Sequence, residues 1–106
     1  MENEGICKVD GRRSPFVTIN GSLKGRLYCD VEINLSTNED YNVIMKLPNG
    51  KYSSLKALEY ADKCEMQLGN FKSVWIKISE VSDTSVQDGQ HADLVNTKCK
   101  IKILKP

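Results

Sequence analysis

The chain has 106 residues, of which 40% are hydrophobic, and its 15 basic and 14 acidic residues leave a formal net charge of +1. This length suits a single domain, residues 1–106, with a core that needs neither metal nor disulfide. The near-neutral charge excludes a protein that attracts nucleic acid through its overall field, so only a local patch could do so. No apolar run reaches the length of a membrane span, and residues 1–11 lack the pattern of a signal peptide. We therefore expect a cytoplasmic protein without a membrane partner.

The first half of the chain predicts strands. Residues 1–4 are expected to be frayed, and residues 6–9 suit a short edge strand. Residues 16–20 alternate between apolar and polar, and Asn20-Gly21 is a dipeptide typical of hairpin turns. Residues 26–35 predict the clearest strand, and a further strand is expected at 41–47. One face of the 26–35 strand would consist of Leu27, Cys29, Val31, Ile33 and Leu35.

Residues 54–68 carry the only clear helical period. Their apolar positions recur at steps of three and four residues, which predicts an amphipathic helix. Ser53 or Ser54 is a suitable N-cap, and Gly69 suits the residue that ends a helix. The apolar stripe would consist of Leu55, Leu58, Ala61, Cys64 and Leu68. We expect this stripe to pack against a sheet.

Alternation returns after the predicted helix, at residues 72–81 and 98–104. Between these two segments, residues 82–96 contain no Lys or Arg and are mostly polar. We expect a long polar loop at 82–96, since loops of this length are often functional. A short helix at 90–95 is the alternative.

The order of these elements predicts an α+β, β-rich fold. It would contain five or six mostly antiparallel strands, with one helix at about 54–68 between strands three and four. This order resembles that of the OB-fold, a five-stranded Greek-key barrel, although the resemblance is in element order alone. The alternative is a twisted sheet packed on one helix, as in β-grasp proteins.

The cysteines and the single histidine indicate no metal site and no cofactor. Cys7, Cys29, Cys64 and Cys99 are widely spaced, whereas zinc ligands usually come in pairs two to four residues apart. Without a leader, buried reduced thiols are favoured over two disulfides. His91 lies in the polar loop, and no nucleophile, base and orienting group form a recognisable set. We therefore expect no enzymatic activity.

Aromatic and basic side chains occupy the strand positions that alternate with the predicted core. Aromatic rings can stack on bases while cations contact phosphates, and Trp, Tyr and Arg also dominate protein interfaces. The rings could instead form a second small core, and the terminal lysine row could protect an edge strand from aggregation. The candidate binding residues are Arg12, Arg13, Phe16, Arg26, Tyr28, Lys46, Trp75, Lys77, Lys98, Lys100 and Lys102.

These residues favour a non-enzymatic binding domain that acts through protein–protein contact, with the 82–96 loop as part of the surface. The alternative is an OB-like protein that binds single-stranded nucleic acid, against which Asp30 and Glu32 on the same strand face would act. Inhibitors and modulators of phages and mobile elements share this small size and lack of enzyme motifs, but no motif here ties the chain to such a source. Self-association through an edge strand is a further expectation.

Overall fold

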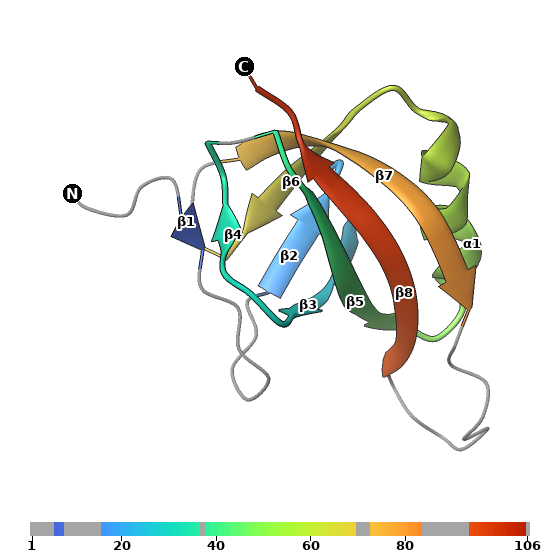
Figure 1. Ribbon diagram of the computed structural model, residues 1–106. Helices are drawn as coiled ribbons and strands as arrows, with labels where there is room; N and C mark the ends of the chain where they lie inside the picture. The colour runs from blue at the N-terminus through green and yellow to red at the C-terminus, as the bar shows by residue number, and fades with distance from the viewer. Residues whose placement is uncertain (1–5, 8–15, 37, 70–72, 84–93, 106) are drawn as a thin grey trace.

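The protein folds into a closed barrel of six antiparallel strands, as the computed structural model in Figure 1 shows. The structure describes residues 6–7, 16–36, 38–69, 73–83 and 94–105. Around the barrel the strands follow the order β2-β3-β5-β8-β7-β6, and β6 pairs with β2 to close it. The barrel strands are β2 (Phe16–Ile19), β3 (Leu23–Cys29), β5 (Asp40–Pro48), β6 (Cys64–Leu68), β7 (Ser73–Asp83) and β8 (Leu94–Ile103).

Two short elements flank the barrel on opposite sides (Figure 1). On one side, β1 (Ile6–Cys7) and β4 (Ile33–Asn34) form a two-stranded antiparallel sheet. On the other, α1 (Tyr52–Ala57) continues into the 3₁₀ helix η1 (Leu58–Tyr60) beside β7. The predicted α+β, β-rich class is confirmed in its OB-like barrel form, with the helix between the third and fourth barrel strands.

Alternating apolar residues fill the barrel. A closed barrel takes one face of every strand inward, so buried residues recur with a period of two. Val17, Leu27, Met45, Ile76 and Ile101, from five different strands, are all completely buried. The sequence alternation at 16–20, 41–47, 72–81 and 98–104 therefore identified core positions correctly.

The turn between β2 and β3 has the predicted chemistry. Asn20 and Gly21 both have positive φ angles, 52° and 77°, which these residue types tolerate better than others. The Ser22 N–H donates to the Ile19 carbonyl oxygen at 3.2 Å. The two strands then pair in register from Ile19↔Leu23 to Phe16↔Arg26.

The predicted helix at 54–68 is wrong in its second half. The helical backbone ends with η1 at Tyr60, and the next regular element is strand β6, which begins at Cys64. In β6 the side chains of Cys64, Met66 and Leu68 are buried, whereas Glu65 and Gln67 are exposed. These residues form a strand because β2 and β7 each pair with β6, and this pairing closes the barrel. Backbone pairing of two strands outweighs a local helical preference.

Polar contacts also attach the helical segment, whose Leu55 is buried in the core, to β7. The Lys77 ammonium donates to the carbonyl oxygens of Glu59 and Ala61, at 2.6 Å and 2.9 Å. The Glu59 carboxylate accepts the Val81 N–H at 2.6 Å. This backbone hydrogen bond is the main cause that lowers the pKa of Glu59 below its ordinary value, and the nearby Lys56 acts in the same direction. The carboxylate is therefore the form that fits this contact.

The predicted strand at 26–35 is divided. Pairing of β3 with β5 ends at Cys29↔Val43, and Asp30 and Val31 form a bend. Val31 is consequently 56% exposed, so its predicted core position is wrong, whereas Ile33 is fully buried.

Tyr41 fixes β4 beyond this bend. Its hydroxyl accepts the Asn34 N–H at 2.8 Å and donates to the Glu39 carboxylate at 3.0 Å. These bonds bring the chain back against the barrel, which is why Ile33 is buried after an exposed segment.

The terminal strand is not an edge. β8 pairs with β5 from Leu94 to Lys102 and with β7 from Thr97 to Ile103. The expectations that its lysine row guards an edge, and that the chain self-associates through this edge, are therefore wrong for β8. Its start also shortens the predicted loop, since 82–83 belong to β7 and 94–96 to β8. Residues 84–93, which include most of the predicted 90–95 helix, lie outside the described residues.

Three cysteines are free thiols. Cys64 and Cys99 are buried and Cys29 is half-buried, as the sequence favoured, and Cys7 has no described side chain. Burial raises the pKa of the Cys99 thiol to about 12 and also raises the pKa of Cys64. Both buried thiols are therefore protonated near neutral pH. Within the described residues, no helix is long and apolar enough to cross a membrane.

Candidate binding surface

Strand pairing brings five of the candidate residues together on the outside of the barrel. Phe16 on β2 faces Arg26 on β3, and Arg26 faces Lys46 on β5. One outward position further along, Tyr28 faces Ile44, which in turn faces Lys98 on β8. We call Phe16, Arg26, Tyr28, Lys46 and Lys98 the basic–aromatic face.

The side chains of this face are accessible. Phe16 is 47% exposed, an unusual fraction for a large apolar ring. Arg26 and Lys98 are exposed, and Tyr28 and Lys46 are half-buried. The Lys46 ammonium lies 5.3 Å from the centre of the Tyr28 ring, within the range of a cation–π contact. A ring and a cation are thus held beside each other at the centre of the face.

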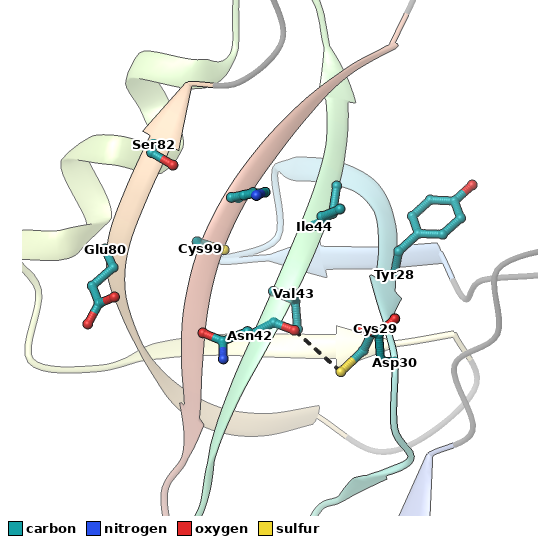
Figure 2. Close-up of a pocket in the computed structure, with 10 residues that line it drawn as sticks. Tyr28, Cys29, Asp30, Asn42, Val43, Ile44, Glu80, Ser82 and Cys99 are labelled. Atoms are coloured by element: carbon teal, nitrogen blue, oxygen red, sulfur yellow. Dashed lines mark hydrogen bonds between the residues drawn. The ribbon is translucent and has the colours of Figure 1, made fainter.

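An open depression of about 610 Å³ continues the face across β5 and β8. Figure 2 shows Tyr28 and Asp30 at its β3 side and Glu80 and Ser82 at its β7 side. Ile44 and Lys98 are among the residues that line it between these sides. The lining therefore combines the Tyr28 ring, the apolar side chain of Ile44 and the cation of Lys98 with the carboxylates of Asp30 and Glu80.

A thiol also lines the depression, at the end of β3. Figure 2 shows the Cys29 sulfur directed at the Asn42 carbonyl oxygen, to which it donates at 3.5 Å. This weak bond lies where β3 leaves the barrel and β5 continues.

Carboxylates neutralise the other two lysines on the outer face of β8, Lys100 and Lys102. Glu80 lies 3.3 Å from the Lys100 ammonium, and Asp40 lies 3.8 Å from that of Lys102. Lys98 makes no ion pair with any residue that the structure describes. The three lysines, equivalent in sequence, therefore differ in the charge that they present.

Glu80 reaches Lys100 because of an irregularity in β7. The register of β7 against β8 shifts between Ser79 and Ser82, and Glu80 has a positive φ of 55°. Such a bulge redirects the side chains around it. The sequence carried a signal for it, since apolar residues step by two to Ile78 and then by three to Val81. Glu80 is nevertheless not among the site residues predicted from the sequence.

Trp75 is exposed but lies away from the basic–aromatic face. It lies near the start of β7, opposite Glu65 of β6, whereas Glu80 and Ser82, the β7 residues that line the depression, lie towards the other end of the strand. Trp75 is 41% exposed, and its ring lies 4.6 Å from the Lys63 ammonium. The expected single surface with Phe16, Tyr28 and Trp75 is therefore divided, and a second core that unites the three rings is wrong.

The other candidates lie elsewhere. Lys77 is half-buried and donates to two carbonyl oxygens at the end of η1, so its role is structural in this conformation. Arg12 and Arg13, like His91, lie outside the described residues. No group of three or more His, Cys, Asp and Glu side chains suited to a metal ion occurs in the described part of the chain.

Comparisons with protein-family models, with curated proteins and with solved structures found no match for this chain.

Proposed function

We propose that the protein is a non-enzymatic binding domain that binds single-stranded nucleic acid on the basic–aromatic face. The observation that carries this proposal is the convergence of two accessible rings and three cations on neighbouring strands. Rings stack on bases of any sequence, and cations contact the phosphates between them.

The position of the face in the barrel supports the same function. β3 and β5 are the second and third barrel strands, and OB-folds bind oligonucleotides with these strands. Arg26 and Tyr28 lie on the second strand, and Lys46 lies on the third. The likeness to the OB-fold supports the proposal through strand order alone, whereas the rings and cations of the face support it through their chemistry.

The near-neutral net charge is compatible with this function. Two acidic side chains near this surface form ion pairs with lysines of β8. Glu80, which lines the depression, pairs with Lys100, and Asp40 pairs with Lys102. Attraction of phosphate depends on the local field, which decays over about 10 Å at moderate salt. The cations of the face therefore act locally, and binding is expected to be weak and strongly dependent on salt.

The proposal is tested with fluorescein-labelled oligo-dT and fluorescence anisotropy at low salt. Replacement of Phe16 and Tyr28 together by Ala is expected to weaken binding at least tenfold, because each base stacked on a ring contributes about 1–3 kcal/mol. Trp75→Ala removes an exposed ring that lies outside the basic–aromatic face and should change the affinity less than twofold. Absence of binding by the wild-type protein, or equal losses in both variants, would refute the proposal.

Protein–protein binding, which the sequence favoured, is the second candidate function, and a different surface supports it. Tyr60 is 86% exposed at the end of η1, and Trp75 is exposed on β7, the strand that η1 contacts. Exposed Tyr and Trp are typical of interface hot spots. A protein partner that binds here should be lost with Trp75→Ala and retained with Tyr28→Ala, as measured by pull-down with a purified partner.

A further inference from the structure

We infer that the nucleic-acid site is short, about four nucleotides, and crosses the strands β3, β5 and β8 obliquely, because Glu80 and Asp40 close it along β8. This inference rests on the proposed function and specifies the length and direction of the ligand. The acidic residues, as much as the basic ones, then define the site.

The cations of the face define a path across the strands. Arg26, Lys46 and Lys98 lie on three successive barrel strands. Arg26 and Lys46 are direct cross-strand neighbours, and Lys98 faces Ile44, one outward position beyond Lys46. Neighbouring strands are about 4.8 Å apart. The cations therefore form an oblique row across the strands, beside the rings of Phe16 and Tyr28.

A second possible path for the phosphates runs along β8. Lys98, Lys100 and Lys102 share the outer face of this strand, and from sequence they form one basic row. In the structure the Lys100 ammonium faces the Glu80 carboxylate and the Lys102 ammonium faces that of Asp40. A phosphate that approached either lysine would also approach a carboxylate. The row therefore presents one unpaired cation within the described residues.

The width of the face and its number of cations set the length of the site and its salt dependence. From β2 to β8 the face covers three inter-strand spacings, roughly 14 Å. The smallest sites on single OB domains hold about four nucleotides. With three phosphate contacts, the logarithm of the binding constant should fall with the logarithm of salt concentration at a slope of about −2, since each contact to a single strand contributes about −0.7.

The experiment measures affinity for oligo-dT of 2 to 12 nucleotides, and the salt dependence of each. For the wild type, affinity is expected to rise steeply up to about four nucleotides and then only by the statistical gain of extra registers. Glu80→Gln should release Lys100 and steepen the slope by about 0.7. Glu65→Gln is the matched control, because it makes the same change in net charge at an exposed position of β6 that faces Trp75 of β7.

Each outcome decides between the two proposals. A steep rise in affinity beyond eight nucleotides, or equal salt slopes for Glu80→Gln and Glu65→Gln, would overturn the short-site inference while nucleic-acid binding stands. Absence of binding at every length would overturn both. Circular dichroism melting of each variant shows whether the barrel is retained, and Glu80→Ala provides a second removal of the carboxylate if Glu80→Gln does not fold.

Discussion

Leu55 is the only fully buried side chain of α1, and its removal should destabilise the whole protein. It is completely buried and belongs to the same core cluster as the inward side chains of the barrel. Truncation of a buried Leu to Ala costs about 2–5 kcal/mol, because transfer energy is lost and a cavity remains. In a domain of about this size, each kcal/mol lowers Tm by roughly 4–8 °C. Leu55→Ala is therefore expected to lower Tm by roughly 10 °C or more.

Leu58→Ala is the matched control for this prediction. It deletes the same atoms from a position in η1 that is only half-buried, so the loss should be less than half of that for Leu55→Ala. The free energy of unfolding is measured by urea titration with circular dichroism at 25 °C. Equal losses would contradict this reasoning, because they are what a regular five-residue helical stripe over 54–68 would give. A loss below about 1 kcal/mol for Leu55→Ala would also contradict it.

Three further predictions concern the barrel, its pH dependence and the binding face. Gly25→Ala should destabilise by about 1–3 kcal/mol in urea titration, because a Cβ there would collide with the Lys46 carbonyl oxygen. The folded-state pKa of Glu59 lies below its ordinary value of 4.5, so its stabilising contribution is present above that value and is lost as pH falls through the folded-state pKa. In Glu59→Gln the free energy of unfolding should therefore fall less steeply as pH drops below about 4.5, as measured by urea titrations at several acidic pH values. An unchanged pH dependence would contradict this prediction. Lys98→Ala should weaken oligo-dT binding several-fold, whereas Lys102→Ala should have little effect, because Asp40 already neutralises Lys102; equal effects in anisotropy titrations would contradict the ion-pair argument.

Strand positions and the core were predictable because the barrel imposes a simple period. The inside of a barrel takes every second residue, and Val43, Met45, Ile76 and Ile78 follow this rule in the sequence as in the structure. The hairpin turn was predictable for a local reason, since Asn20-Gly21 can adopt positive φ angles without support from the rest of the fold. Local signals of this kind need no knowledge of which strands become neighbours.

The segment 64–68 was mispredicted because five residues fit both periods. Cys64 and Leu68 are four residues apart, as on one helix face, while Cys64, Met66 and Leu68 also alternate as in a strand. Long-range pairing makes this segment a strand, because β6 forms hydrogen bonds with both β2 and β7 and so removes two open sheet edges at once. Nothing in residues 64–68 themselves indicates that two strands will pair with them, so the local pattern cannot distinguish a strand from a helix here.

Closure of the barrel also explains why the sequence predicted exposed candidate residues correctly but not which of them lie together on one surface. In an open sheet packed on one helix, all polar-face side chains would share one exposed surface, and Tyr28, Trp75 and the lysines would lie together. In a closed barrel the polar face is the outside of a cylinder, so strands half a turn apart point in opposite directions. Tyr28 then keeps Phe16 and Lys46 as neighbours, whereas Trp75 keeps Lys63. Because two separated aromatic surfaces can bind different ligands, single replacements at Tyr28 and Trp75 distinguish the two surfaces, whereas replacement of both residues in one variant would not.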